Sequence, residues 1–403
     1  MRPLPLIAAL TRQQVLRVLI ALFVFSAAAL PASAQEGGRP NVIAQIFTAD
    51  GNSSIRLYTP EGTEAGVLVE NPTVRVIISP DLRWRVNAGY DATRQTEVLE
   101  FSALNGTPIA LPIETGFNLL DAGISRDSKY LFYTITNLER RAWAVGIVEF
   151  ESGKATQFNA LFDDSSPVGG GQVGSALDYA NGAVLLTAFV PYTDGNFGGV
   201  YRFEAQADQI GLGQQTMPPA ARLFPAGVNA SLALSPDGSQ IAFLYGDPAN
   251  PPAQYQPLGP GFTLNTLAVL TLATGELRVI AQAGVGQALE SMSWTSDGTQ
   301  IIFTGGGYQN SYYIVTPTLF TVDVATGQVN VLTAMTADPA EVIGGLRVCG
   351  DTLFFDATKA IDPATGSGGN EATLFAAPLA AAGSRQAVAK GALVATLGCA
   401  SAG

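Results

Sequence analysis

Apolar and polar residues alternate along most of the chain in short runs that are separated by tight turns. Ala233–Tyr245, ALSPDGSQIAFLY, shows the unit most clearly: a short strand, a turn, and an apolar-rich second strand. Pro236 presets φ for a first turn position, the Asp237 carboxylate accepts backbone N–H groups, and Gly238 takes a positive φ without steric cost. The pattern predicts an antiparallel strand pair rather than a helix.

The same unit recurs along the chain. Ser293–Thr304 reads SWTSDGTQIIFT, and more degenerate copies begin at Ile77, Gly123, Leu177 and Arg347. The residues expected to anchor the turns are Asp81, Asp127, Asn181, Asp237, Asp297 and Asp351. Turn formation accounts for these side chains, so we interpret them as structural residues rather than as metal or ligand groups.

A second hairpin follows several copies of the first. Thr266–Arg278 and Thr318–Asn330 each run into a Gly-containing turn and out again. One repeat therefore has four antiparallel strands, and radial stacking of such sheets is a β-propeller. The segments SPDGSQIAF and TSDGTQIIF resemble the repeat of TolB-type and related WD-repeat-like propellers of the bacterial envelope. The resemblance spans Val74–Asp356 and implies a part in envelope protein assemblies.

The two ends of the propeller region supply the remaining blade. Val42–Val69 has the pattern of three strands of a blade that lacks its first, and Ala392–Cys399 reads as a lone first strand. We predict that these segments pair and close one all-β domain, residues 42–403, with seven blades; a six-bladed ring, as in TolB-type proteins, is the alternative. Cys349 and Cys399 then lie near the ends of neighbouring inner strands, either as a disulfide that fastens the closing blade or as two reduced, buried thiols.

Residues 1–34 have the features of an export signal. Arg12 and Arg17 precede the apolar run Val18–Leu30, and Ala32-Ser33-Ala34 supplies a small-x-small cleavage site. The apolar run is shorter than the roughly 20 residues that span a bilayer, so cleavage is expected rather than a retained anchor. Residues 35–41 form a polar lead-in. We expect an extracytoplasmic protein, periplasmic or secreted, with no stable membrane insertion.

The amino-acid composition excludes several kinds of partner, catalytic site and metal site. The net charge of −12 argues against nucleic acid as a partner, and the absence of histidine excludes Ser-His-Asp triads and His-ligated zinc. Asp50-Gly51-Asn52 and Asp194-Gly195-Asn196 hint at calcium loops, but EF-hand spacing is absent, so we expect plain turns and no cofactor. A carboxylate calcium site that uses Asp121, Asp178 or Asp356 stays open.

Strand order predicts that the long connections emerge on one face of the ring. Long loops on a rigid scaffold are where binding residues usually lie. The long connections are Leu161–Ser175, Pro191–Gly199, Gly246–Phe262, Gly305–Pro317 and Ala357–Glu371, while the turns of the opposite face are uniformly short. The candidate binding aromatics are Tyr192, Phe197, Tyr255, Phe262, Tyr308, Tyr312 and Tyr313. The alternative is that these side chains cover small cores of the loops themselves.

These observations predict a monomeric, non-catalytic binding scaffold that recognises a protein or a polysaccharide. No G-x-S-x-G nucleophile motif occurs in the sequence, which argues against a propeller-linked hydrolase. Two other classes remain open at this point: a calcium-dependent hydrolase or lyase, and a structural surface protein.

Overall fold

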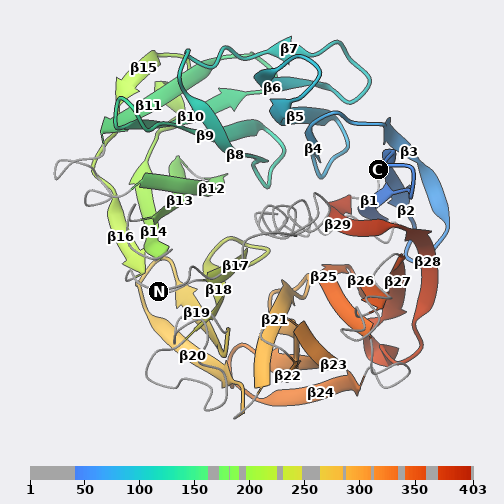
Figure 1. The fold of residues 1–403 in the computed structure, drawn as a ribbon. Helices are drawn as coiled ribbons and strands as arrows, with labels where there is room; N and C mark the ends of the chain where they lie inside the picture. Colours follow the sequence, from blue (N-terminus) through green and yellow to red (C-terminus); the bar gives the residue numbers. More distant parts are fainter. Residues whose placement is uncertain are drawn as a thin grey trace, which may run out of the picture.

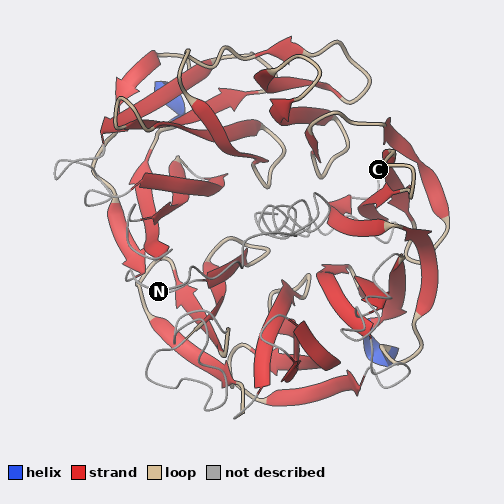
Figure 2. Ribbon diagram, in the orientation of Figure 1, coloured by secondary structure: helices blue, strands red, loops and turns tan. Residues whose placement is uncertain are grey.

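Seven β-sheets surround a central axis in the computed structural model (Figure 1). It describes residues 41–161, 172–180, 182–189, 197–224, 230–246, 264–284, 287–309, 313–334, 341–359 and 371–400. Six sheets have four strands and one has five, which confirms the predicted seven-bladed propeller and excludes six blades. Strands dominate the described ranges, whose two helices are short 3₁₀ turns (Figure 2). Neither helix has the length and hydropathy to traverse a lipid bilayer.

We number the blades in chain order and give their strands from the innermost outward. Blade 1 contains β29 (Leu393–Ala400), β1 (Asn41–Phe47), β2 (Ser53–Tyr58) and β3 (Glu64–Glu70). Blade 2 contains β4 (Arg75–Ile78), β5 (Trp84–Asp91), β6 (Thr96–Ala103) and β7 (Ile109–Ala110). Blade 3 contains β8 (Asn118–Ile124), β9 (Tyr130–Asn137), β10 (Ala142–Glu149), β11 (Ala155–Leu161) and the added β15 (Gly213–Thr216).

Blades 4 to 7 follow the same order. They contain β12 (Gln172–Ala180), β13 (Ala183–Phe189), β14 (Phe197–Glu204) and β16 (Ala221–Phe224); β17 (Ala230–Leu234), β18 (Gln240–Tyr245), β19 (Thr266–Thr271) and β20 (Leu277–Gln282); β21 (Gln287–Trp294), β22 (Gln300–Gln309), β23 (Tyr313–Asp323) and β24 (Val329–Ala334); and β25 (Glu341–Cys349), β26 (Thr352–Lys359), β27 (Ala372–Pro378) and β28 (Gln386–Gly391). The 3₁₀ turns are η1 (Ala207–Gln209) and η2 (Leu379–Ala381).

Blade 1 joins the two ends of the chain. The C-terminal strand β29 pairs antiparallel with β1, with Cys399 opposite Val42 and Leu393 opposite Phe47. Figure 1 shows the red β29 beside the blue β1. The predicted closure of the ring by the C-terminal strand is therefore confirmed. It also removes the exposed edge that the inner side of β1 would otherwise present.

The hydrophobic core is divided among the blade interfaces. Each of the seven described core clusters lies between two neighbouring blades, including the pair formed by blades 7 and 1. The middle strands are consequently buried on both faces: β9 and β10 have almost no exposed position, and Trp143 is fully buried between blades 3 and 4. Outer strands such as β20 are mostly exposed, since no further strand covers them. The apolar runs seen in the sequence are the sandwiched middle strands.

The two faces of the ring differ in their connections. Turns between the first and second strands, and between the third and fourth, emerge on one face, which we call the short-turn face; the other connections emerge on the long-loop face. Most connections of the short-turn face are tight, such as residues 235–239 and 272–276 of blade 5. The expectation that all of them are short is wrong in blade 4, where residues 205–220 separate β14 from β16 and contain β15.

This longer excursion links blades 4 and 3. β15 leaves its own blade and pairs in parallel with β11 at the outer edge of blade 3. The Thr156 hydroxyl of β11 donates to the Gln209 carbonyl (2.6 Å) and accepts from the Gly211 N–H (2.9 Å). The sequence GQQT of β15 lacks an apolar alternation, so its strand conformation depends on the neighbouring blade.

The Asp turns share one hydrogen-bond pattern in blades 2, 3, 5 and 6. In blade 6 the Thr295 hydroxyl donates to Asp297 Oδ1 (2.7 Å) and accepts from the Gln300 N–H (3.0 Å). Asp297 Oδ1 also accepts the Thr299 N–H (3.0 Å). Ser79–Asp81, Ser125–Asp127 and Ser235–Asp237 make the same contacts. These carboxylates are engaged by their own turns, while Asn181 of blade 4 lies outside the described residues.

Replacing Asp297 with alanine is expected to lower the free energy of unfolding by about 1–2 kcal/mol, because the Thr299 N–H and two hydroxyls lose their shared acceptor. Asp297→Asn keeps one carbonyl acceptor and is expected to lose less. Urea unfolding of the two variants provides the measurement, and an unchanged midpoint in Asp297→Ala would show that the carboxylate does not support the turn.

Candidate functional site

Three long connections emerge on the long-loop face, while residues 205–220 of blade 4 make the one comparably long excursion described on the short-turn face. Residues 246–265 connect β18 to β19, residues 360–371 connect β26 to β27, and residues 162–171 connect blade 3 to blade 4. Most residues of these connections lie outside the described part of the chain. Their ends are fixed by strand pairing: Tyr245 lies directly opposite Thr266, and the Asn265 N–H donates to the Tyr245 carbonyl (3.0 Å). The connection 246–265 therefore leaves and re-enters the blade at one point of this face.

The predicted binding aromatics distribute over three blades of this face. Tyr192, Tyr255, Phe262 and Tyr312 lie outside the described residues, and so does the second D-G-N segment, Asp194–Asn196. Phe197 begins β14, where its backbone pairs with Phe189, and Tyr308 and Tyr313 lie at the adjoining ends of β22 and β23. The side chains of these three residues also fall outside the description. Their backbones place them at the long-loop end of blades 4 and 6.

One of the five predicted loops is mostly regular structure. β22 continues to Gln309 and β23 begins at Tyr313, so most of Gly305–Pro317 forms an extended hairpin rather than an irregular loop. The glycine run at Gly305–Gly307 hid this continuation in the sequence, because glycine is depleted in strands. The backbone here is held by cross-strand pairs and a register shift between Gly305 and Gly307.

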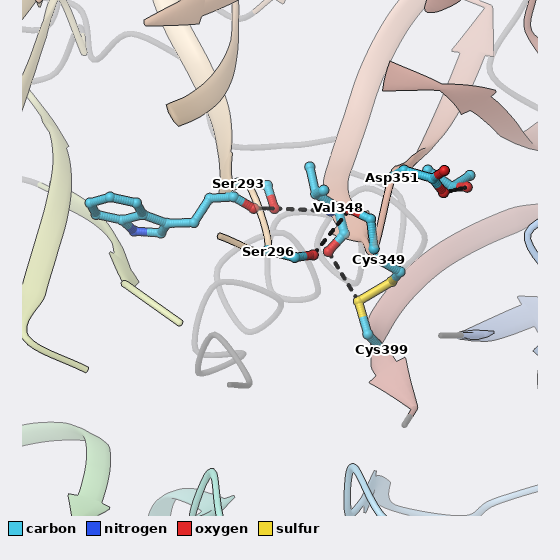
Figure 3. The surroundings of a disulfide bond; sticks show 9 residues. Ser293, Ser296, Val348, Cys349, Asp351 and Cys399 are labelled. Carbon is cyan, nitrogen blue, oxygen red and sulfur yellow. Dashed lines mark hydrogen bonds between the residues drawn. A yellow bond between two sulfur atoms is a disulfide. The ribbon is translucent and has the colours of Figure 1, made fainter. Parts of the chain in front are cut away.

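Cys349 and Cys399 form a disulfide bond between blades 7 and 1 (Figure 3). Cys349 ends β25 at the position where other blades carry the turn hydroxyl, such as Thr295 in blade 6. Cys399 lies near the end of β29, and Ser293 of blade 6 accepts the Val348 N–H (3.1 Å) beside the bond. The disulfide thus replaces the hydroxyl contact of the turn with a covalent bond between blades 7 and 1.

The innermost strands carry buried charge that sequence reasoning only partly found. Asp121 of β8 pairs with Arg75 of β4 (2.5 Å), which joins blades 2 and 3. Asp121 is one of the three carboxylates considered as calcium ligands, and here its charge is balanced by Arg75. Asp178 of β12 is likewise paired, with Arg126 of the blade 3 turn (2.7 Å). Two of the three carboxylates are thus neutralised by guanidinium groups.

Asp356 has a different environment. It lies on β26, is only 6% exposed, and accepts the Gly345 N–H at Oδ1 (2.7 Å). A Cβ atom at Gly344 would lie 2.0 Å from Asp356 Oδ2, so the glycine pair of β25 makes room for the carboxylate. Burial raises the pKa of Asp356 to about 7. Burial, together with the charge of Asp356, also raises the pKa of Glu290 on β21 to about 7.

This acid pair was missed in the sequence because Glu290 lies in no motif and only the ring brings β21 and β26 together. Asp50, of the first D-G-N segment, bonds within its own turn: Asn52 Nδ2 donates to Asp50 Oδ2 (2.8 Å). Within the described ranges no group of three or more Cys, Asp or Glu side chains is placed to hold a metal ion.

The fold is similar to solved propellers. No protein-family profile and no curated protein sequence matches the chain. The β-propeller domain of the trilobed protease from Pyrococcus furiosus matches with a TM-score of 0.51 at 12% identity, over 88% of this chain and 95% of that one. Oligogalacturonate lyase from Vibrio parahaemolyticus matches with a TM-score of 0.50 at 12% identity, over 88% and 86%.

TolB proteins are also among the matched structures, as the sequence resemblance predicted. TolB from Acinetobacter baumannii has a TM-score of 0.39 at 14% identity, over 83% of this chain and 76% of its own. The chain spans 40% and 53% of two matched peptidases, a prolyl endopeptidase and an acylaminoacyl peptidase. At these identities the similarity is one of fold: this chain is a seven-bladed β-propeller.

Proposed function

We propose that the chain is an exported, non-catalytic binding scaffold of the bacterial envelope or its surroundings, which recognises a protein or a polysaccharide through the long-loop face. The scaffold part of this proposal rests on the ring itself. Every blade interface has its own buried core, and the ring is fastened by β29 and the disulfide. A rigid ring of this kind holds the strand ends from which the connections leave in fixed relative positions, which lowers the entropy lost when a partner binds.

The observation that carries the choice of face is the difference in connections between the two faces. On the short-turn face, the Ser or Thr and Asp side chains of the Asp turns bond to each other and to the backbone of their own turn. On the opposite face, residues 246–265 and 360–371 extend from paired strand ends. The first of these is rich in proline and carries Tyr255 and Phe262, side chains that offer rigid contact area.

The extracytoplasmic location rests on the sequence. Residues 1–34 read as an export signal, and a disulfide persists most readily in an oxidising compartment. The absence of histidine removes the commonest general base and metal ligand, which favours binding over catalysis.

Shortening residues 249–261 to a tight turn is expected to leave the melting temperature unchanged, since the strand ends at Tyr245 and Thr266 remain paired. The same variant is expected to lose its partner. Affinity capture from envelope extract of the source bacterium, with residues 35–403 as bait, provides the measurement.

Glu151→Ala is the matched control for this capture. Glu151 is exposed on the short-turn face and pairs there with Arg83. Its removal is expected to leave the captured partner unchanged. Equal capture by the loop variant and the intact chain would place recognition elsewhere, and a collapse of the loop variant's melting transition would show that residues 249–261 belong to the core.

A further inference from the structure

A cavity of about 240 Å³ opens between blades 4 and 5 on the short-turn face. Its walls are apolar, formed mainly by Val184, Leu185, Leu234 and Leu272, and its charged groups are Arg126, Asp178 and Arg202. The volume lies just below the usual range of ligand pockets, about 300–1,000 Å³, and suits a ligand of amino-acid size. The cavity lies on the face opposite the long loops, so the inference below does not depend on the proposed function.

Strand register places Asp178 and Arg202 on either side of the apolar Leu185 at the cavity. Asp178 of β12 lies directly opposite Leu185 of β13, which in turn lies directly opposite Arg202 of β14. Directly opposed side chains project to the same side of a sheet, so the three residues form one row. Leu185 packs in the core cluster between blades 4 and 5, which places this row toward blade 5. The Cα atoms of Asp178 and Arg202 are then about 10 Å apart, two strand spacings.

Arg126 fixes the acidic end of this row. It comes from the Asp turn of blade 3, at the position that Pro236 occupies in blade 5, and its side chain is 10% exposed. Its Nε donates to Asp178 Oδ2 (2.7 Å), while Nη1 donates to the carbonyls of Ser235 and Pro236 (3.4 Å each). One guanidinium thereby holds three blades at the cavity.

Gly238 makes this arrangement sterically feasible. A Cβ atom there would lie within 2.0 Å of the Arg126 guanidinium, and the residue has a φ of +72° that favours glycine. Arg126 is therefore locked between the turns, and Asp178 is oriented by it.

Two polar atoms at opposite ends of the row are left without partners. Asp178 Oδ1 is buried and accepts no hydrogen bond within the described part of the chain, although the carboxyl group is only 3% exposed. Arg202 Nε is buried and donates to no described acceptor, while its Nη2 pairs with Glu204 (3.2 Å). A buried polar atom without a partner destabilises the folded chain, so a ligand that supplies both partners would bind more tightly.

We propose that this cavity binds a free α-amino acid with an aliphatic side chain. The ammonium group donates to Asp178 Oδ1, and the carboxylate accepts from Arg202 Nε. The aliphatic side chain packs on Leu185, Leu234 and Leu272. Asp178 is already paired with Arg126, and Arg202 with Glu204, so the charges around the cavity sum to zero. A zwitterion adds no net charge to this site, whereas a cation or an anion would.

Isothermal titration of the intact chain with L-leucine tests the proposal. N-acetyl-leucine lacks the ammonium group and 3-methylbutylamine lacks the carboxylate, so each is expected to bind at least tenfold more weakly than leucine. Arg202→Gln is expected to weaken leucine binding roughly tenfold or more, because a charge-assisted hydrogen bond is lost. Arg202 is 39% exposed at its side chain, so this variant is expected to fold normally.

A blocking variant gives a second, independent readout. Ala273 lies in the exposed turn at the cavity, and Ala273→Trp is expected to abolish leucine binding. Ala325→Trp is its matched control, since Ala325 occupies the same turn position in blade 6 and does not line the cavity. Failure of all twenty common amino acids to bind at millimolar concentration would overturn the proposal and leave ordered water as the occupant. Leucine binding that Ala273→Trp does not change would overturn it equally.

Discussion

Deletion of residues 392–403 is expected to make the chain aggregate. The deletion removes β29, the innermost strand of blade 1, and leaves the β1 edge from Asn41 to Phe47 unpaired. It also opens the core cluster in which Val394 packs with Val42 and Phe354. An exposed, apolar strand edge is a template for intermolecular pairing. Size-exclusion chromatography and thermal melting provide the measurement.

The matched control separates the strand from the disulfide. Cys349→Ser/Cys399→Ser keeps β29 and restores a hydroxyl at the turn position where other blades carry Ser or Thr. Because the bond closes a sequence separation of 50 residues, its loss is expected to lower the free energy of unfolding by about 4 kcal/mol in the loop-entropy description. The double variant is expected to remain a monomer with a lower melting temperature. A deletion variant that is monomeric and melts like the intact chain would contradict closure by β29.

The stability of the ring is expected to fall as the pH rises from 5 to 8. The pKa of Asp356 is raised to about 7 in the folded chain, whereas its ordinary value is 3.8. Between these values the unfolded chain has lost the proton and the folded chain has kept it, so ionisation favours unfolding. Each pH unit costs about 1.4 kcal/mol for one such group. Burial raises the pKa of Glu290 in the same direction, so this residue adds to the fall in stability.

Asp356→Asn is expected to flatten this pH dependence and to make the chain more stable than the wild type at pH 8. The amide retains an oxygen that accepts the Gly345 N–H and carries no charge. Below about pH 4 both chains are expected to lose stability, since turn hydrogen bonds lower the pKa of Asp297 and Asp323. Melting temperatures at pH 5, 6, 7 and 8 provide the measurement. Parallel curves for the two chains would show that Asp356 ionises as it does in the unfolded state.

Much of this fold is readable from local sequence, because each blade is specified by its own turns. The S-P-D-G and A-T-G-E segments predict the hairpins, and the incomplete blades at Val42–Val69 and Ala392–Cys399 predict the closure that β29 and β1 make. β15 was not predictable in this way. Its four residues pair with a strand of another blade, and the Thr156 contacts that hold the excursion involve residues more than fifty positions apart.

The candidate sites depend more on tertiary structure than the fold does. Asp178 was noticed as a carboxylate, but its partner Arg126 comes from a turn of the preceding blade, where it replaces a proline of the repeat. The cavity beside it is lined by Asp178 and Arg202, which share a row across three strands. Glu290 and Asp356 likewise meet only across blades. The sequence signal that could have indicated these sites is the departure from the repeat at two turn positions, Arg126 and Cys349.

The central claim is that recognition takes place on the long-loop face. Hydrogen–deuterium exchange of residues 35–403, with and without the captured partner, tests it most directly because it reads every backbone segment of both faces in one experiment. We predict that protection on binding falls within residues 246–265 and 360–371 and spares the Asp turns at residues 235–239 and 295–299. Protection confined to those turns, or to the cavity between blades 4 and 5, would contradict the claim.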